Sequence, residues 1–391
     1  MTKLNPPFYQ HIVAKGLPYD RGFTHGSLAK EKIKTNIAHY KLPGKLIPLT
    51  ECYEIIKTIY VPGIEKFFPS ALEEMRGIAD GAEVDYLDVL LLNSRYDLAR
   101  IKSKDGSHNA EGSNSANECT SCAVLGTETS NGDVLTGQNW DMSSHLLFQD
   151  LVVFLEIYPH ESEGLPNMFI TTEAGQLARS GMNSAGLGVC ANSLMSTEDF
   201  NPLSDSKPRL PVSLIRRQYL HQKLFGSALM GVFNTPRHVS NNLTVSTAEG
   251  FAMCLELTPT DMYRVYPKNR DIVVHGNHFE TIEFASSKFK DRYPGPSSWY
   301  RVRRVEQELY RHKLLDQKTI TTAFCDHLSR PLSVCQHPSD NDLSNTPKHA
   351  YSGSNATVAH VMYNLTRGIA TVCKGPPCEG QLQSFSLSKS Y

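Results

Sequence analysis

The chain has 391 residues, of which 40% are hydrophobic and 20% are charged, and its 39 basic and 40 acidic residues almost cancel. This is the composition of a globular protein that can bury one large core or two to three ordinary ones. The net charge of -1 gives no reason to expect nucleic acid or an anionic membrane as a partner. The composition therefore favours small-molecule or protein chemistry.

The two ends of the chain and its cysteines bear on the compartment. The N-terminus lacks an apolar run long enough for a secretory signal, and nowhere do apolar residues continue far enough to span a membrane. The nine cysteines are odd in number and scattered, which suits a reducing compartment better than a disulfide framework. The C-terminal Lys-Ser-Tyr is not a peroxisomal address. We therefore expect an intracellular, cytoplasmic protein with no membrane partner.

The residues before Cys119 show mainly helical periodicity. Apolar residues recur at three- and four-residue spacings in three stretches, residues 22–40, 51–68 and 71–99. Residues 101–118 carry almost no apolar side chains and predict an exposed linker, the kind of segment where cleavage concentrates. We therefore expect residues 1–118 to form a mostly helical prosegment that ends in a linker.

The residues after Cys119 are rich in short β-type runs. Turn signals separate seven such runs, at residues 122–128, 133–140, 151–159, 167–175, 181–194, 242–259 and 356–375. The short turns predict antiparallel pairing. Two helical segments, residues 211–233 and 297–315, interrupt these runs. The pattern predicts an α+β fold with two antiparallel sheets between helices.

Nine segments in chain order carry a family resemblance. They read GLPYDRGFTHG, EEMRGIADGAEVDYLDVLLLNSR, CTSCAV, GQNWD, FITTEAG, GMNSAGLGV, VVHGNHF, PSSWYRVRRVEQEL and ATVAHVMYN. The chain resembles the acyl-coenzyme A:isopenicillin N acyltransferases and their wider group, the C45 peptidase-like N-terminal-nucleophile hydrolases. This resemblance implies a four-layer αββα sandwich and a precursor that cuts itself before a cysteine. It also implies one intertwined domain made of an α-subunit, residues 1–118, and a β-subunit, residues 119–391.

Cys119 stands where the polar linker meets the first β-type run. A thiol there can attack the carbonyl of Glu118 and form a thioester, which water hydrolyses to leave a free α-amine on Cys119. Such an amine has a pKa of about 7.7 to 8.0, so it can accept the thiol proton in later catalysis. The alternative is a buried cysteine that only packs. The linker, the strand and the resemblance together favour the nucleophile.

The resemblance implies roles for four further residues. Asp141 corresponds to a carboxylate of the family's catalytic centre, and its alternative is the N-cap of a following helix. Asn277 corresponds to an asparagine whose amide can donate to an oxyanion, and its alternative is a turn residue. Thr120 matches the hydroxyl residue after the nucleophile. Ser240 aligns approximately with a serine that the family uses.

Two departures from the family pattern concern the substrate and the cut. Ser354 stands where the penicillin-making enzymes have an arginine, so the site is expected to lack that cation and penicillin-type substrates are not assumed. Glu118 replaces a glycine before the nucleophile, which favours slower self-cleavage.

Arg21 and Arg95 are expected to make surface or interchain contacts rather than to act in catalysis.

A metal site is the main alternative reading of Cys119. With Cys122, His275 and His278 it offers four zinc ligands. However, strand alternation points the two cysteines to opposite faces, so Cys122 is assigned to the core and the histidines to local hydrogen bonds. No metal site and no bound cofactor are expected.

These observations predict a self-processing cysteine acyltransferase. It would move an acyl group from a thioester, such as acyl-CoA, or from an amide donor to an amine in specialised metabolism. Its partners are the small-molecule donor and acceptor and its own cleaved N-terminal fragment. Two alternatives stay open. One is an amidohydrolase of the same fold, and the other is an uncleaved, non-enzymatic binding protein.

Overall fold

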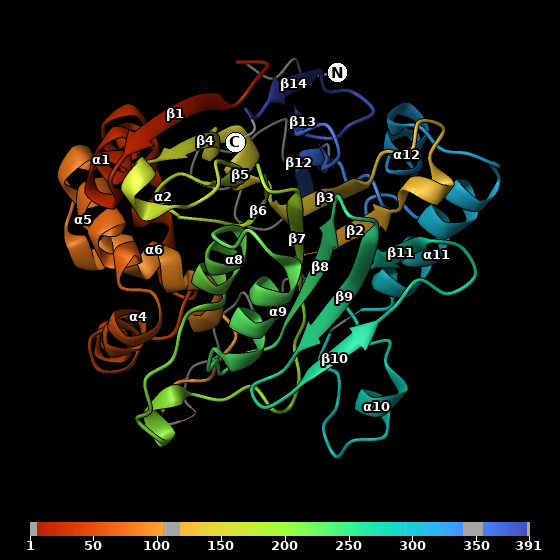
Figure 1. Cartoon of the computed structure of the whole chain (residues 1–391). Helices are drawn as coiled ribbons and strands as arrows, with labels where there is room; N and C mark the ends of the chain where they lie inside the picture. Colours follow the sequence, from red (N-terminus) through yellow and green to blue (C-terminus); the bar gives the residue numbers. More distant parts are fainter. Residues whose placement is uncertain (1–5, 105, 107–117, 294, 339–354, 389–391) are drawn as a thin grey trace.

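The computed structural model describes residues 6–104, 106, 118–293, 295–338 and 355–388. Within these ranges, the chain forms an eight-stranded and a six-stranded β-sheet that lie between two sets of helices. In Figure 1 the N-terminal helices lie on the left and the helices α11 and α12 on the right, with the sheets between them. None of the helices described in these ranges is long and apolar enough to cross a membrane.

The N-terminal part is largely helical, as the sequence predicts. The helices are α1 (Pro18–Leu28), α2 (Lys30–Tyr40), α3 (Leu49–Ile55), a π-helical segment (Ile56–Tyr60), α4 (Val61–Phe67), α5 (Ser70–Ala82) and α6 (Tyr86–Leu98). The predicted first helix is divided at Ala29, whose backbone leaves the helical conformation. A strand that the sequence analysis did not predict, β1 (Gln10–Gly16), precedes them.

Helices α1 and α5 cross at very short range because glycines line both of them. Gly22 and Gly26 on α1 face Gly77 and Gly81 on α5. A Cβ atom added at Gly22 would lie only 1.9 Å from the carbonyl oxygen of Glu74, so no larger residue fits without separating the helices. The sequences GFTHG and GIADG therefore specify this contact.

The two sheets divide the remaining strands. The larger sheet has the order β1-β4-β5-β6-β7-β8-β9-β10, and the smaller has the order β11-β2-β3-β12-β13-β14. Their bounds are β2 (Cys119–Val124), β3 (Leu135–Ser143), β4 (Val152–Pro159), β5 (Met168–Glu173), β6 (Ser180–Asn183), β7 (Leu187–Ser193), β8 (Asn241–Thr247), β9 (Phe251–Leu257), β10 (Met262–Val265), β11 (Ile272–His275), β12 (Asn355–Asn364), β13 (Ile369–Lys374) and β14 (Leu382–Ser386).

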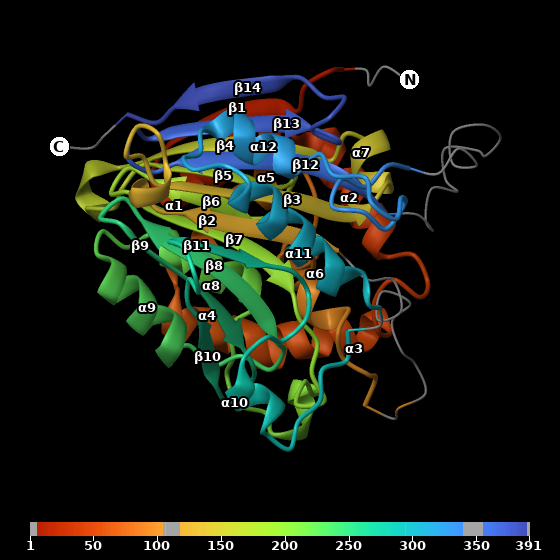
Figure 2. The ribbon, with the colours of Figure 1, turned by 90° about the vertical axis from the view of Figure 1, so that its right-hand side faces the viewer.

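Antiparallel pairing is confirmed for the strand pairs described here, apart from β1 and β4, which run parallel with Gln10 opposite Val153. The edge strands β1 and β14 lie side by side at one end of the two sheets (Figure 2). The rings of His11 and Phe385 make this contact, with centroids 4.4 Å apart.

Three apolar clusters fill the interfaces between four layers. The first joins the N-terminal helices, α8 (Val212–Leu220) and α9 (Phe225–Asn234) to the larger sheet. The second lies between the sheets, and the third joins the smaller sheet to α11 (Ser297–Tyr310) and α12 (Gln317–Ala323). This is the predicted αββα sandwich. The predicted helix at 211–233 is two helices, and the one at 297–315 ends at Tyr310.

Candidate active site

Cys119 begins β2, between β11 and β3 in the smaller sheet. It pairs with Trp140 on β3, and its side chain belongs to the apolar cluster between the two sheets. Cys119 and Glu118 are both buried, at 0% and 3% exposure. The thiol of the uncut chain is therefore closed to solvent by the fold around it.

A buried arginine contacts the thiol. Arg179, in the loop before β6, donates from Nη2 to Sγ of Cys119 over 2.9 Å. Its guanidinium lies over the ring of Trp140, 4.4 Å from the centroid. Burial raises the pKa of the Cys119 thiol, and the charge of Arg179 opposes this rise. Burial outweighs the cation, so the thiol pKa stays raised overall, and Arg179 is the group that can stabilise a thiolate once it forms.

Asn277, just after β11, holds the backbone nitrogen of Cys119. Its Oδ1 accepts the Cys119 N–H at 2.7 Å and also accepts from Nη2 of Arg301 at 2.9 Å. Its Nδ2 donates to the backbone oxygen of Ser193 at 3.0 Å. Two donors facing one end of the amide settle which end carries the oxygen. In the uncut chain Asn277 is therefore an acceptor for the nucleophile's nitrogen, whereas the sequence analysis expected it to donate to an oxyanion.

A second buried arginine holds the other side of β2. Arg301, on α11, donates from Nη1 to the Cys119 carbonyl oxygen at 2.8 Å and to Thr120 Oγ1 at 2.7 Å. Burial lowers the pKa of Arg301, but Tyr293, Glu118 and other anionic groups outweigh this effect and raise it overall. The structure therefore brings Thr120 into the site through Arg301.

The sequence analysis did not foresee Arg301 or Arg179. In α11, Arg301 lies on the buried stripe that also carries Val302, Val305 and Leu309. An arginine on the apolar face of an amphipathic helix was the available signal. Ser354, where the family arginine was expected, lies outside the described residues. The sequence analysis expected that one arginine to be missing, and two other arginines contact Cys119.

Asp141 lies within β3, opposite Thr357 on β12. The N-cap alternative is wrong, because Ser144 is the residue that precedes the next helix, α7 (His145–Phe148). Asp141 Oδ1 accepts from Thr357 Oγ1 at 2.5 Å, while Oδ2 is buried with no hydrogen-bond partner among the described residues. Burial raises its pKa well above the usual carboxyl range. Asp141 is therefore poised to hold a proton beside the nucleophile's strand.

Glu118 is held by its side chain rather than left in a free linker. Oε1 accepts from Ser297 Oγ at 2.8 Å, and Oε2 accepts from Gln336 Nε2. The Arg301 Nε atom lies 3.6 Å from Oε2. The residue before the nucleophile is therefore fixed on three sides, although most of the predicted linker lies outside the described residues.

Two predicted residue groups lie elsewhere. The hydroxyl of Ser240 donates to Asp199 Oδ1 at 2.6 Å, so its contacts place it beside a neighbouring pocket rather than at the thiol. Arg21 and Arg95 are buried rather than at the surface. Their contacts with Glu163 and Glu173 join residues 1–118 to residues 119–391, which is the interchain part of the prediction.

The alternative zinc ligands do not face one another. Cys122 belongs to the apolar cluster on the far side of β2 from Cys119, as strand alternation predicts. His275 bonds Glu256 Oε1 at 2.9 Å, and His278 bonds Ser298 Oγ at 2.7 Å. Both histidines therefore make the local hydrogen bonds that were expected.

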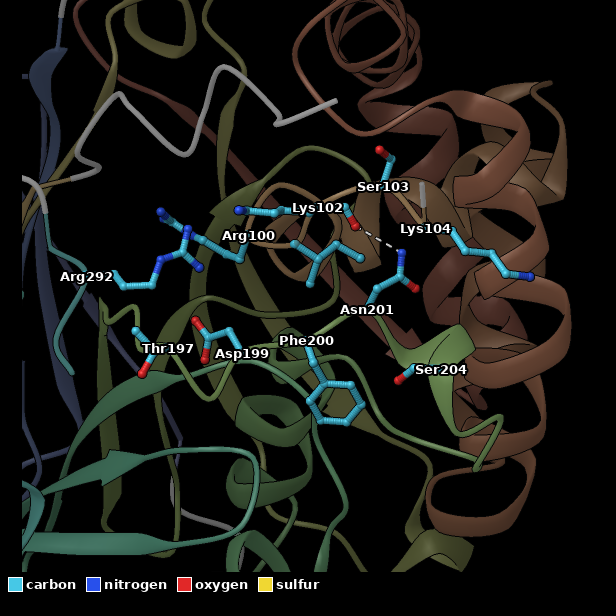
Figure 3. A pocket seen from close by; sticks show the side chains of 11 residues that line it. Arg100, Lys102, Ser103, Lys104, Thr197, Asp199, Phe200, Asn201, Ser204 and Arg292 are labelled. Atoms are coloured by element: carbon cyan, nitrogen blue, oxygen red, sulfur yellow. Dashed lines mark hydrogen bonds between the residues drawn. The ribbon is translucent and has the colours of Figure 1, made fainter. Parts of the chain in front are cut away.

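A pocket of about 450 Å³ lies next to this site (Figure 3). Its basic residues are Arg100, Lys102, Lys104 and Arg292, with Asp199 among the other lining residues. In Figure 3, Arg100, Lys102 and Arg292 lie on the same side of the pocket, opposite Lys104. Arg100 Nη2 donates to Ser193 Oγ at 3.0 Å, and Ser193 is the residue whose carbonyl holds Asn277. Ser193 thus contacts both Arg100 of the positively charged pocket and Asn277.

Comparison with known proteins gives the family. The description "Acyl-coenzyme A:6-aminopenicillanic acid acyl-transferase" belongs to the family profile that matches residues 127–377, more than half of the chain. The chain belongs to this family. It is 26% identical to the 40 kDa form of acyl-coenzyme A:6-aminopenicillanic-acid-acyltransferase of Emericella nidulans, over 83% of this chain and 84% of the relative. The family match begins after Cys119, so it does not itself identify the nucleophile.

Other similar proteins match this chain over different shares of their length. An uncharacterized protein of Archaeoglobus fulgidus is 32% identical over 52% of this chain but only 34% of its own length. Among solved structures, a mutant conjugated bile acid hydrolase from Clostridium perfringens has a TM-score of 0.42 at 13% identity, over 70% of this chain and 98% of that chain. Penicillin V acylase from Agrobacterium tumefaciens has a TM-score of 0.40 at 12% identity, over 69% and 87%.

Proposed function

We propose that the chain is a self-processing acyltransferase whose nucleophile is Cys119. The observation that supports this best is the set of contacts around Cys119. Arg179 contacts the thiol, Asn277 holds the nitrogen, and Arg301 contacts the carbonyl of Cys119. Such fixed partners suit a bond that is to be cut and a nitrogen that is to become a free amine.

The first reaction is the cut between Glu118 and Cys119. The thiolate attacks the Glu118 carbonyl carbon, a C–S bond forms, and the peptide C–N bond breaks. The proton lost by the thiol ends on the leaving nitrogen, which becomes the α-amine. Water then hydrolyses the thioester to give the Glu118 carboxylate and the free thiol. In this step Arg179 stabilises the thiolate and Asn277 Oδ1 holds the departing nitrogen.

The second reaction repeats this chemistry on a substrate. The new α-amine, whose reference pKa is about 7.7 to 8.0, takes the thiol proton as Cys119 attacks the acyl carbon of the donor. The C–S bond to Cys119 forms, the bond between the acyl group and its carrier breaks, and the proton passes to the departing carrier, which is a free thiol when the donor is a thioester. An amine acceptor then attacks the thioester and leaves with the acyl group. Arg301 is proposed to keep its positive charge beside the nucleophile while this happens, and Asp141 is proposed to hold a proton there.

The charged pocket supports an anionic acyl donor. Four basic side chains line it, and Ser193 connects one of them, Arg100, to Asn277. The names of the family and of the Emericella relative specify an acyl-coenzyme A donor. For this chain we propose an acyl thioester with an anionic carrier, such as acyl-CoA, and a small amine acceptor. Its cytoplasmic location and its place in specialised metabolism stay predictions.

Comparing the wild-type chain with Cys119→Ala tests the proposal. The wild type should give two fragments on a denaturing gel, with Cys119 at the start of the larger one, while Cys119→Ala should stay whole. Cys122→Ala is the matched control, because Cys122 lies on the far face of the same strand and should leave cleavage intact. A wild-type chain that stays whole, or a Cys119→Ala chain cut at this bond, would contradict self-processing.

A product assay on the processed enzyme then distinguishes acyl transfer from hydrolysis. Incubation with acyl-CoA and a panel of amines should give an amide product along with free CoA. Release of only free acid from thioesters and amides would show an amidohydrolase, which shares the acyl-enzyme but admits water to it. A chain that is whole and inert toward every donor would be a binding protein.

A further inference from the structure

Four metal-type ligands converge at a place away from Cys119. His327, Cys335 and His337 come from the segment after α12, and Cys378 comes from the turn between β13 and β14. Their ligand atoms all lie within 4.8 Å of one another. We propose that these two cysteines and two histidines bind one zinc ion, which fastens the segment after α12 to the β13–β14 turn.

The distances are close to those of a zinc tetrahedron. Zn–S bonds of about 2.3 Å and Zn–N bonds of about 2.0 to 2.1 Å require ligand atoms about 3.3 to 3.8 Å apart. The two Sγ atoms are 3.6 Å apart, and the Nε2 atoms of His327 and His337 are 3.0 Å apart. The Sγ atom of Cys378 lies 3.4 Å from Nε2 of His327 and 3.2 Å from Nε2 of His337. The Sγ atom of Cys335 lies 3.6 Å from Nε2 of His337. These separations match the tetrahedral values or fall slightly short of them, so small shifts of the side chains would satisfy all four bonds.

The surroundings of the ligands support binding. Nδ1 of His337 lies 3.4 Å from Glu379 Oε1, the outer carboxylate that commonly orients a zinc-binding imidazole. The backbone N–H of Cys335 donates to the Asp326 carbonyl at 3.0 Å, and the Asp326 side chain is paired with Arg304. These contacts fix the ligands from outside the cluster.

The ligand set selects the metal and the type of site. Two thiolates and two imidazoles suit zinc better than the hard cations Ca²⁺ and Mg²⁺, which prefer oxygen. Four protein ligands complete a tetrahedron and leave no open position, so the ion is structural rather than catalytic. A Cys335–Cys378 disulfide is the main competitor. It would need the sulfurs to move from 3.6 Å to about 2.05 Å and would leave both histidines without a role.

The zinc site has a consequence for the bond that we propose is cut. Gln336 lies between two ligands, Cys335 and His337, and its amide donates to the Glu118 carboxylate. Its backbone N–H donates to Thr357 Oγ1 at 2.9 Å, and the same hydroxyl donates to Asp141. The ion therefore holds in place the segment that touches Glu118. This consequence rests on the proposed self-processing, whereas the binding of zinc does not.

Metal analysis of the uncut Cys119→Ala chain tests the site without relying on self-processing. Protein purified under reducing conditions, supplied with zinc and dialysed should hold one zinc per chain by plasma mass spectrometry. Cys378→Ser and His327→Asn, both at exposed positions, should each lose most of the metal. Cys325→Ser is the matched control, because this thiol is near in sequence but outside the ligand set, and it should keep the metal.

Thermal unfolding provides a second readout. Removing zinc with a chelator should lower the Tm of the Cys119→Ala chain but not that of its Cys378→Ser derivative. Peptide mapping should find Cys335 and Cys378 reduced. A chain without stoichiometric zinc, ligand variants that keep it, or a Cys335–Cys378 disulfide in reduced preparations would overturn the site.

Discussion

At the scale of single residues, the chemistry of Cys119 depends on two charges that a short motif does not contain. Arg179 comes from the larger sheet's loop and Arg301 from the outer helix layer, and both are fully enclosed. A cation buried without a partner is costly, so each persists because it faces sulfur, carbonyl or carboxylate groups. Two enclosed arginines therefore contact one strand end, which is unusual for a purely structural position.

Replacing Arg179 should shift the pH dependence of self-cleavage. Its charge lowers the thiol pKa, so Arg179→Gln should raise that pKa further and leave less thiolate at neutral pH. An opposite charge at such range changes a pKa by about 1 to 3 units, so cleavage at pH 7 should slow by about tenfold or more. The rate should recover as the pH rises toward the new thiol pKa.

Gel-based cleavage kinetics between neutral and alkaline pH would measure this shift. Arg179→Lys is the control, because it keeps the charge and should shift the profile less. If Arg179→Gln slowed cleavage equally at every pH, Arg179 would be acting through packing on Trp140 rather than through its charge.

Two substitutions of Asn277 separate its possible roles. Asn277→Ala removes the acceptor for the Cys119 nitrogen and should slow turnover by about 10² to 10³, the range found for a lost active-site hydrogen-bonding group. Asn277→Asp keeps an acceptor oxygen but loses the donor. Retained turnover in Asn277→Asp would support positioning of the amine, whereas a loss equal to that of the alanine variant would indicate donation to an oxyanion.

These rates must be normalised to the amount of cleaved protein, because the proposed maturation would use the same groups. Circular dichroism would show whether each variant folds. An Asn277→Ala protein that folds, cleaves and turns over like the wild type would remove Asn277 from the site.

The sequence predicted part of this site, and the missing part has a physical cause. Cys119 was found where the polar linker meets a β-type run, and Thr120, Asp141 and Asn277 were found through the family resemblance. In the structure, Asn277 holds the Cys119 nitrogen, and Thr120 and Asp141 lie on β2 and on the neighbouring β3. Their roles in the reaction stay predictions. The arginines were missed because contacts across 60 and 182 residues depend on how the layers stack. Cys378 is likewise far in sequence from the other zinc-type ligands, and only the β13–β14 turn places it beside them.

At the scale of elements, periodicity performed well where one face of an element is apolar. The N-terminal helices and the main hairpins follow their patterns. The four-residue strand β10 was missed because its length gives too few alternations to detect, whereas the seven-residue strand β1 is as long as strands that were predicted and was overlooked. The β3 strand was predicted only as far as Trp140, which made Asp141 look like a cap when it is a strand residue.

The α1–α5 crossing gives a prediction at this scale. A Cβ at Gly77 would lie 2.1 Å from the carbonyl oxygen of Tyr19, so Gly77→Ala must push the helices apart. We expect the free energy of unfolding to fall by about 1 to 3 kcal/mol or more. Gly231→Ala on α9 is the control, because open space surrounds this helical glycine, and it should stabilise by up to about 1 kcal/mol.

Denaturant unfolding in the Cys119→Ala background, where one chain unfolds, would measure both effects. Equal effects of the two substitutions would show that the close contact is not what Gly77 provides.

At the scale of the whole molecule, residues 1–118 are part of the sandwich rather than an appendage. Their helices cover the outer face of the larger sheet and share its apolar cluster (Figure 1). Buried charges also cross the proposed cut. Glu74 accepts from both Arg21 and Arg217, and Arg95 pairs with Glu173. Breaking such an enclosed pair leaves a charge unpaired, which costs about 3 to 5 kcal/mol.

The two fragments should therefore stay together after cleavage. Gel filtration of the processed protein should give a single peak of the full mass that contains both fragments, stable in moderate salt because the charges are enclosed. Arg95→Ala should weaken this association, and Arg76→Ala, whose pair with Glu73 is exposed, is the control. A folded, active fragment that begins at Cys119 and elutes alone would contradict this prediction.

The proposed cut would turn the parallel pairing of β1 with β4 from a step within one chain into a step between two chains. Before the cut, both strands belong to one polypeptide, so they meet in a first-order step whatever the protein concentration. Afterwards they belong to different molecules, and a denatured fragment must find its partner by diffusion before the larger sheet can regain its edge. Dilution would then lower the unfolding midpoint of the mature protein but not that of its precursor. If the chain is cut as we propose, the mature enzyme would therefore refold less easily than the precursor from which it was made.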